Sequence, residues 1–381
     1  MSPPDRAAVL GPLAELVPVA LRGTAPYHVP KPEGLRAKLD ANELPYPLPP
    51  ELAAGLAAEL ARVPLERYPA ADAGELRPVA ARTLGVAPES LVFGNGSDDL
   101  ITMLCAAFSQ PRPGQARAGV LYPAPTFVYY RIAALTRGLD PLEVPLREDF
   151  TLDEEAVEAA VRTRRPNLAM FALPNNPTGT LWPPEWVAGL AERNPDLIVV
   201  SDEAYLAYGG RTLIPRLASL PNLVVMRTLS KIGMAGLRVG ALTAHPAVVA
   251  ELEKVRPPYN LGSLAQRAAA WLLTHATDWI DARAREVVAE RGRLAEALRA
   301  LPETRVFDSE ANLLLVRFGV PGDGRATTIW QHLHHRGILV RTFDRPGPLS
   351  GCLRITVGTP AENNLLIEML RELHQPMAAA G

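Results

Sequence analysis

The sequence predicts an α/β fold in which a mostly parallel sheet is flanked by helices and followed by a smaller α+β domain. Fully apolar runs at 168–173, 197–200 and 223–226 are typical of strands buried on both faces of such a sheet. Helical spacing of apolar residues separates these runs, as at 186–193. Polar residues follow directly after the runs, and the carboxyl ends of strands are where open α/β sheets bind ligands.

The chain length predicts more than one domain. Its 381 residues exceed what a single small core holds, so a large domain with a smaller one is expected. We expect a proline-broken N-terminal arm at 1–35, the large domain at 36–275 and the small domain at 276–381, with 36–65 able to pack on the small domain. Helical spacing over 264–301 predicts one long helix that bridges the two domains.

The composition excludes several classes of partner. The formal net charge of −2 implies no polyanionic partner, so no nucleic-acid partner is expected. No run of about 18 uninterrupted apolar residues occurs, so no membrane-spanning segment is expected. Cys105 and Cys352 are too few for a disulfide framework, and 1–10 shows no signal pattern. A reducing, cytoplasmic setting is therefore predicted.

A glycine-rich turn, Gly94-Asn95-Gly96, follows a short apolar segment and precedes a helix predicted to begin at Ser97 or Asp98. Glycines before a helix N-terminus let backbone N–H groups converge on an anion, and the helix dipole adds to the attraction. A serine cap after an ordinary turn explains the same residues. The motif alone therefore leaves phosphate binding and a plain turn both open.

The stretch 227–240 places a lysine between hydroxyl-bearing and small residues. Thr228 and Ser230 precede Lys231, and Arg238 follows the lysine by seven positions. A lysine that forms a Schiff base must lose its proton, hold a fixed position and leave room beside it for a flat ring. The two hydroxyls and the guanidinium can bind a dianionic group. A surface lysine in a glycine-rich turn is the alternative.

Four further side chains follow predicted strands. Phe127 comes after the strand predicted at 118–123, where it can stack on a planar ring or simply belong to the core. Asn176 lies in a loop that two prolines stiffen, which presents its amide as a donor. Asp202 ends a buried strand, and Tyr205 lies three positions beyond it. All four belong to the edge of the sheet where a ligand is expected.

The C-terminal part predicts an α+β arrangement. Arg341 and Arg354 each lie on the strand face opposite their apolar neighbours, where they can bind an anionic substrate or face solvent. His332, His334 and His335 lie together without a carboxylate or cysteine at ligand spacing, so no metal site is expected. The predicted elements are strands at 311–318, 338–343 and 352–357 and helices at 329–335 and 360–373.

These pieces match the needs of pyridoxal 5′-phosphate. Lys231 can form the covalent link to the cofactor, and a carboxylate such as Asp202 can keep the pyridine nitrogen protonated so that the ring accepts electrons. The glycine turn and Arg238 can hold the phosphate. The released lysine amine can then move a proton between the substrate and the cofactor.

The chain resembles the fold-type-I pyridoxal-phosphate aminotransferases, and within them the histidinol-phosphate aminotransferases. The resemblance extends from about 27 to 373, and its motifs follow the family's order. They are Leu-Asp-Ala-Asn-Glu at 39–43, Arg-Tyr-Pro at 67–69, Gly-Asn-Gly-Ser-Asp-Asp at 94–99, Asn-Asn-Pro-Thr-Gly at 175–179, Asp-Glu-Ala-Tyr at 202–205, Thr-Leu-Ser-Lys at 228–231, Gly-Leu-Arg-Val-Gly at 236–240 and Cys-Leu-Arg-Ile-Thr-Val-Gly at 352–358.

The resemblance implies roles for the cofactor-binding residues. Lys231 is expected to be the Schiff-base lysine and Asp202 the partner of the pyridinium nitrogen, while Tyr205 and Asn176 contact the ring hydroxyl. Phe127 is expected to stack on the ring, where relatives often have tyrosine. The residues expected at the cofactor phosphate are Ser97, Asp98, Thr228, Ser230 and Arg238. Many relatives have eight positions from the lysine to the arginine, so the spacing of seven is a departure that bears on Arg238.

The resemblance also implies the substrate site and the assembly. Arg354 is expected to meet the anionic end of the substrate, with Arg341 and Tyr27 beside it, and Asn42 belongs to the loop that covers the substrate. Tyr68 is expected to reach the cofactor phosphate of the neighbouring subunit, which implies a homodimer with shared active sites.

The expected reaction is ping-pong transamination of L-histidinol phosphate with 2-oxoglutarate, which gives imidazole-acetol phosphate and L-glutamate in histidine biosynthesis. Three alternatives stay open at this point. One is an aromatic or broad-specificity aminotransferase, and another is a threonine-phosphate decarboxylase on the same scaffold. The third, a regulator that uses the aminotransferase body as a sensor, is disfavoured because 1–35 is too short and proline-rich for a DNA-binding domain.

Overall fold

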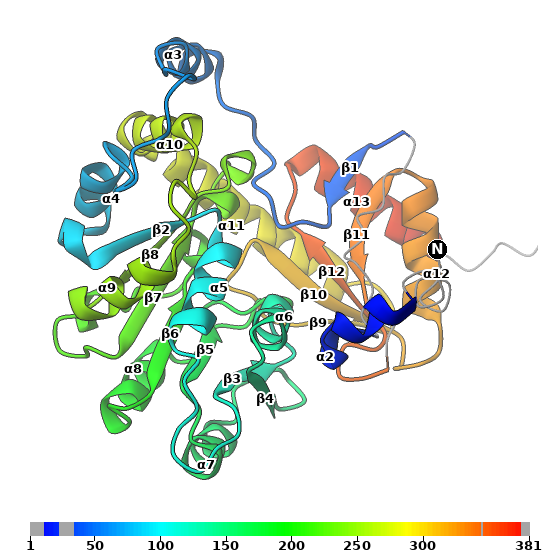
Figure 1. Ribbon diagram of the computed structural model, residues 1–381. Helices are drawn as coiled ribbons and strands as arrows, with labels where there is room; N and C mark the ends of the chain where they lie inside the picture. The colour runs from blue at the N-terminus through cyan, green and yellow to red at the C-terminus, as the bar shows by residue number, and fades with distance from the viewer. Residues whose placement is uncertain (1–10, 23–33, 344–345, 375–381) are drawn as a thin grey trace, which may run out of the picture.

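The computed structural model describes residues 11–22, 34–343 and 346–374, and these residues form two sheets with their covering helices (Figure 1). The larger sheet has the strand order β2-β8-β7-β6-β5-β3-β4 within this part of the chain. Its strands are β2 Leu91–Gly94, β3 Gly119–Ala124, β4 Asp140–Pro145, β5 Leu168–Ala172, β6 Ile198–Asp202, β7 Leu223–Thr228 and β8 Gly240–Ala244.

The larger sheet is mostly parallel, as the sequence predicts. Strands β4, β3, β5, β6 and β7 pair in parallel, while β8 runs antiparallel to both β7 and β2. Strand β5 is buried throughout and β6 nearly so, which explains the apolar sequence of β5 and of the first three residues of β6. Because β5, β6 and β7 are parallel neighbours, the loops that leave their carboxyl ends lie at one edge of the sheet.

Helices cover both faces of the larger sheet. Apolar residues of α5, α6 and α9 form one core layer against it, and those of α7 and α8 form the layer on the other face. Helices α4 and α10 pack against the β2 end of the sheet. These helices, with α3, are α3 Pro50–Leu60, α4 Leu76–Leu84, α5 Ser97–Ala107, α6 Tyr129–Thr136, α7 Glu154–Arg164, α8 Pro184–Arg193, α9 Pro246–Val255 and α10 Ser263–His275.

The smaller sheet has the order β1-β11-β12-β10-β9 among the described residues, and Figure 1 shows it beside α12 and α13. Strand β1 precedes the larger sheet in the chain yet pairs in parallel with β11. One face packs on α11, α12 and α13. The elements are β1 Ala37–Leu39, β9 Thr304–Val306, β10 Leu313–Phe318, β11 Ile338–Thr342, β12 Cys352–Thr356, α11 Thr277–Arg299, α12 Arg325–His335 and α13 Pro360–His374.

Short helical turns complete the described chain. They are η1 Gly11–Leu16, α2 Val19–Arg22, η2 Pro88–Ser90, η3 Leu206–Tyr208, η4 Ile214–Arg216, η5 Leu229–Lys231 and η6 Ala235–Leu237. Among the residues described, no helix is long and apolar enough to cross a membrane. The domain boundaries expected at 36 and 276 stay predictions.

The single long helix predicted over 264–301 is wrong, because the structure has two helices there. Helix α10 ends and α11 begins at Ala276, whose backbone (φ −113°, ψ 4°) leaves the helical region. The residues that follow explain the restart. Thr277 and Asp278 favour the first turn of a helix over its interior, since Asp278 brings a negative charge to the helix N-terminus.

Candidate active site

A buried carboxylate stands at the end of β6. Asp202 is only 5% exposed, and its Oδ2 accepts a hydrogen bond from the hydroxyl of Tyr130 at 2.7 Å. Its Oδ1 accepts from the backbone N–H of Ala204 at 3.2 Å. Burial raises the pKa of Asp202 to about 6, while the two donors oppose that rise. The carboxylate is therefore mostly ionised at neutral pH and can hold a cationic group.

Lys231 follows the neighbouring strand β7, at the end of η5. The Tyr208 hydroxyl donates a hydrogen bond to the backbone carbonyl of Lys231, which holds the main chain. The Nζ atom donates to the carbonyl of Ala41 at 3.2 Å and lies 5.8 Å from the centre of the Tyr205 ring. The amine thus has a neutral acceptor and an aromatic face beside it, and its hydrogen bond to Ala41 can be exchanged for another partner.

Asn42 joins the two sheets at this point. Its Nδ2 donates to the Tyr205 hydroxyl at 2.9 Å, and its Oδ1 accepts from Thr356 Oγ1 at 3.1 Å. Asn312 Nδ2 donates to the Asn42 carbonyl at 3.0 Å. Asn42 is 1% exposed and has a positive φ of 55°, a conformation that asparagine tolerates better than most residues. The loop between β1 and α3 is therefore held both to Tyr205 and to Thr356 of the smaller sheet.

The glycine-rich turn and Arg238 lie together. Helix α5 begins at Ser97, directly after Gly96, which has φ 80°. A Cβ built at Gly96 would lie 2.5 Å from Arg238 Nη2, so a larger residue here would displace the guanidinium. Arg238 Nη2 also donates to Asp98 Oδ2 at 3.2 Å. Glycine is thus required both for the backbone conformation and for the approach of this arginine.

Hydroxyls complete this cluster. Arg238 Nη1 donates to Ser230 Oγ at 3.3 Å, and Thr228 Oγ1 donates to Ser230 Oγ at 3.0 Å. Arg238 therefore reaches the hydroxyls despite its spacing of seven positions from Lys231, helped by a left-handed backbone conformation with φ 53°. A guanidinium, two hydroxyls and the first turn of α5 form a surface suited to a phosphate group.

Two arginines of the smaller sheet lie opposite each other. Arg341 on β11 and Arg354 on β12 are register partners in an antiparallel pair, so their side chains lie on one face. Arg354 Nη1 donates to Asn176 Oδ1 at 2.6 Å, and Nη2 donates to the carbonyl of Asp40. Asn176 follows β5 of the larger sheet, so this hydrogen bond joins the arginine face to the site at the strand ends.

The remaining predicted residues are placed as follows. The Phe127 ring meets the Tyr130 ring edge-on, with centroids 5.7 Å apart. Tyr68 stacks on Tyr259 at 4.8 Å and is 82% exposed. None of the hydrogen bonds or ring contacts found in the described chain joins Tyr68 to another predicted site residue. Tyr27 lies outside the described residues.

Sequence reasoning missed two tyrosines that support the site. Tyr130 donates to Asp202, and Tyr208 donates to the Lys231 carbonyl. Each lies three positions after a residue that was singled out, Phe127 and Tyr205 respectively. A spacing of three places residues on one face of a helical turn, and this was the available signal.

The role of Glu203, the next residue after Asp202, is also visible. Its side chain is fully buried, pairs with Arg227 at 2.8 Å and accepts from the Leu213 N–H at 2.7 Å. Burial raises the pKa of Glu203, and Arg227 opposes the rise. Glu203 therefore has a structural role that differs from that of Asp202. It fixes the loop before η4 to strand β7.

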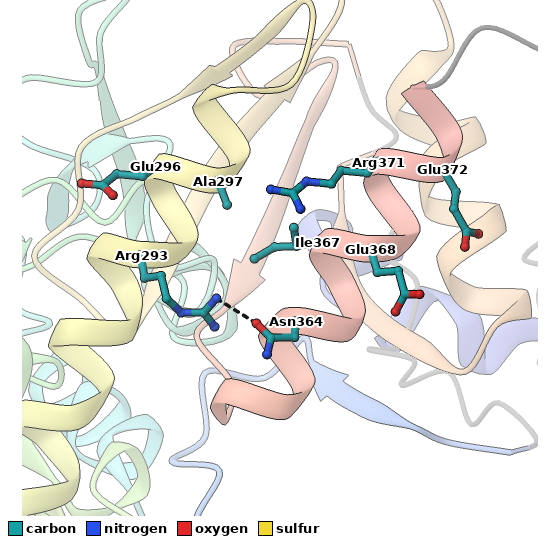
Figure 2. A pocket seen from close by; sticks show the side chains of 8 residues that line it. All are labelled: Arg293, Glu296, Ala297, Asn364, Ile367, Glu368, Arg371 and Glu372. Atoms are coloured by element: carbon teal, nitrogen blue, oxygen red, sulfur yellow. Dashed lines mark hydrogen bonds between the residues drawn. The ribbon is translucent and has the colours of Figure 1, made fainter.

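A surface groove of about 670 Å³ lies elsewhere, between α11 and α13. Figure 2 shows Arg293 reaching across it to Asn364, to which it donates a hydrogen bond of 2.8 Å. Acidic and basic side chains line both walls, including Glu296 and Arg371. The groove shares no residue with the site at the strand ends, and we assign it no role.

Comparison with known proteins identifies the family. The family model described as "Aminotransferase class I and II" matches residues 37–370. A histidinol-phosphate aminotransferase of Chromobacterium violaceum is 43% identical over 359 residues, which are 94% of this chain and 97% of that protein. A histidinol-phosphate aminotransferase of Paracidovorax citrulli is 44% identical over 348 residues, 88% of this chain and 91% of the relative.

Solved structures agree with the fold. The histidinol-phosphate aminotransferase of Sinorhizobium meliloti, solved with pyridoxal-5′-phosphate, matches with a TM-score of 0.79 and 26% identity, over 89% of this chain and 92% of that one. An L-threonine-O-3-phosphate decarboxylase of Porphyromonas gingivalis matches with a TM-score of 0.75 and 23% identity, over 89% of this chain and 99% of that one, and indicates the fold alone. The chain therefore belongs to the class I and II aminotransferases and, within them, to the histidinol-phosphate aminotransferases.

Proposed function

We propose that this protein transfers the amino group of L-histidinol phosphate to 2-oxoglutarate, giving imidazole-acetol phosphate and L-glutamate in a ping-pong reaction. The observation that carries the proposal is the placement of Asp202 and Lys231 at the ends of parallel neighbouring strands, with Arg354 tied to the same edge through Asn176. An anionic carboxylate, an amine and a substrate-binding arginine are the groups that this reaction needs.

The residues present fit pyridoxal phosphate as the cofactor. Gly96 leaves space that a Cβ would fill, and Arg238 and Ser230 converge beside it, as a phosphate requires. Asp202 is buried, yet two donors favour its charged form, as a partner of a pyridinium nitrogen requires. Thr228 and the first turn of α5 would complete the phosphate site, with Phe127 against the ring.

Pyridoxal phosphate, when bound, supplies an aldehyde that links to amines and a protonated pyridine ring that withdraws the electron pair left on the substrate's α-carbon. Asp202 would keep the proton on the ring nitrogen. Lys231, once released as a free amine, removes the proton from the α-carbon of the substrate. Tyr205 and Asn176 would donate hydrogen bonds to the ring hydroxyl, and the hydrogen bond from Asn42 orients the Tyr205 phenol.

The arginine face explains how one site can accept both substrates. Histidinol phosphate carries a phosphate, and 2-oxoglutarate carries a distal carboxylate. Arg341 and Arg354 lie side by side across β11 and β12, so their guanidinium groups can serve either anion.

The proposed assembly is a cytoplasmic homodimer. Tyr68 is 82% exposed and is held by Tyr259, as suits a side chain that reaches the cofactor phosphate of a second copy. The ring stack fixes the direction of Tyr68 before the partner arrives, which lowers the entropy cost of the contact.

Purified protein with pyridoxal phosphate tests the reaction directly. We expect L-histidinol phosphate to convert the cofactor's visible absorption to that of the amine form, and 2-oxoglutarate to restore it with formation of glutamate. Phenylalanine in the same assay identifies a broad or aromatic specificity, and O-phosphothreonine with detection of carbon dioxide identifies a decarboxylase. Carbon dioxide released without any requirement for 2-oxoglutarate would overturn the proposal.

A further inference from the structure

We propose that Tyr130 is a positioning residue that keeps Asp202 anionic and oriented toward the cofactor's ring nitrogen. The inference rests on the proposed function, because it deepens the role assigned to Asp202. Its starting point is a contact between two groups that are both buried: the Tyr130 hydroxyl donates to Asp202 Oδ2 at 2.7 Å. Tyr130 is 0% exposed and Asp202 is 5% exposed, so water cannot substitute for the lost bond without rearrangement.

Tyr130 contributes the stronger of the two donors to Asp202. The second donor, the backbone N–H of Ala204, binds Oδ1 at 3.2 Å, which is longer and comes from the adjacent turn. A phenol that donates to a carboxylate makes a charge-assisted hydrogen bond, worth roughly twice a neutral one. Because the two donors bind different oxygens, they fix the plane of the carboxylate as well as its charge.

The other ionisable groups around Asp202 do not supply this stabilisation. Asp98 on α5 and the adjacent Glu203 are acidic and raise the pKa of Asp202. Tyr205 lies near Tyr130 and raises its pKa. Burial and the Asp202 charge raise the pKa of Tyr130 further, so Tyr130 keeps its proton and stays a donor at every working pH. The phenol is thus the side chain that favours the anionic form.

Tyr130 also contacts a second residue that is expected at the cofactor. Tyr130 lies in the first turn of α6, and its ring meets Phe127 edge-on with centroids 5.7 Å apart. Phe127 is the residue expected to stack on the cofactor ring. Replacement by phenylalanine would keep this ring contact and remove the hydroxyl alone, which separates the proposed role from core packing.

Tyr122 provides a matched control. It lies on β3, is 3% exposed, and its hydroxyl donates to the carboxylate of Glu143 at 3.1 Å. Tyr122→Phe therefore removes a similar hydrogen bond from a buried tyrosine without touching Asp202. An effect that arises only from a lower stability of the fold should therefore appear in both Tyr130→Phe and Tyr122→Phe.

The test compares the cofactor-loaded wild type, Tyr130→Phe and Tyr122→Phe. In Tyr130→Phe, the proton between the carboxylate and the ring nitrogen shifts toward Asp202. The pH midpoint of the cofactor's visible band should then rise by about one to two pH units, the equivalent of one charge-assisted hydrogen bond. Tyr122→Phe should keep the wild-type midpoint. An unchanged midpoint in Tyr130→Phe would overturn the inference.

A cofactor analogue with carbon in place of the ring nitrogen shows whether Tyr130 positions Asp202 or only supports the fold. Tyr130→Phe should bind pyridoxal phosphate about tenfold or more weakly than the wild type, yet bind the analogue equally well. Equal weakening for both ligands would assign Tyr130 a structural role only. Incorporation of 3-fluorotyrosine at position 130 keeps the side-chain shape and makes the phenol a stronger donor, so the midpoint should fall; a rise would contradict the inference even if Tyr130→Phe does not fold.

The spectrum of the wild type separates a failure of the proposed function from a failure of the inference about Tyr130. If the wild type shows no visible cofactor band, the proposed function fails before Tyr130 is considered. If the wild type shows the band and Tyr130→Phe titrates identically, the function stands and the inference about Tyr130 fails.

Discussion

The inner and outer ends of the site are built by different means. The inner end, Asp202 and Lys231, comes from the ends of two neighbouring strands of the larger sheet. The outer end, Arg341 and Arg354, comes from the smaller sheet and meets the larger one through Asn176. This difference implies a division of roles. The larger sheet holds the groups that react, and the junction of the two sheets binds the anionic group of the substrate. Changes at the inner end should lower kcat, and changes at the outer end should raise KM.

Lys231→Ala should have the largest effect. Loss of the amine removes both the covalent link to the cofactor and the proton carrier, so kcat should fall by at least about 10⁴-fold. The Nζ atom donates a hydrogen bond of 3.2 Å to the Ala41 carbonyl, a contact that the fold can lose, so the fold should remain. Steady-state turnover measures the fall in kcat, and circular dichroism measures whether the fold remains. Lys254→Ala on α9 is the control. Turnover within tenfold of the wild type would remove Lys231 from the chemistry.

Asp202→Asn tests the inner end without the cofactor. The folded protein raises the pKa of Asp202 from 3.8 to about 6, so between these pH values it binds more protons than the unfolded chain. The free energy of unfolding therefore falls as the pH rises through this range. Asparagine does not titrate, so the variant lacks this fall in the free energy of unfolding. The stability of the variant relative to the wild type should increase by about 2 kcal/mol between pH 4 and pH 7.

Urea unfolding of the cofactor-free proteins at several pH values measures this difference. A stability difference that does not change with pH would mean that Asp202 ionises in the folded protein as it does in the unfolded chain. The carboxylate would then lack the buried environment on which the inner end depends.

Sequence reasoning could predict the inner end because each residue follows a strand with a strong local signal. Strands β5, β6 and β7 each contain a short apolar run, and polar residues follow the runs of β6 and β7, so the strand ends could be placed. Strands β4 and β8 were missed for physical reasons. Strand β4 carries Pro141 and Pro145 at the edge of the sheet, and β8 is rich in small residues.

The contacts between distant segments could not be predicted in the same way. Asn42 binds Tyr205 and Thr356 only because β1 crosses to the smaller sheet and pairs with β11. The bond from Tyr130 to Asp202 spans 72 positions in the chain. Local periodicity carries no information about such pairs, so the fold class could be predicted further than the hydrogen bonds that tune the site.

Arg354→Leu tests the outer end. Loss of a guanidinium that binds an anionic group should raise KM for L-histidinol phosphate and for 2-oxoglutarate by about 10- to 100-fold, with a smaller change in kcat. Arg317→Leu on β10 is the control, because Arg317 donates to the Pro348 carbonyl and lies outside the site. A fall in kcat with an unchanged KM would break the division between the two ends.

Tyr68→Phe should have the smallest effect and tests whether a second copy completes the site. Removal of one hydroxyl at the cofactor phosphate should weaken cofactor binding by about tenfold, while the ring stack on Tyr259 is kept. Tyr259→Phe keeps the same stack and should leave the affinity unchanged. Fluorescence titration with pyridoxal phosphate gives both values. Equal affinities in all three proteins would place Tyr68 away from the cofactor.

Borohydride reduction of the purified protein tests the central claim, that Lys231 and Asp202 hold the same heterocycle. The account predicts a visible absorption band that reduction abolishes, with the phosphopyridoxyl mass on the peptide that contains Lys231. It also predicts that the band's pH midpoint moves in Asp202→Asn. A label on another lysine, or a band that does not respond to the change at Asp202, would contradict the account.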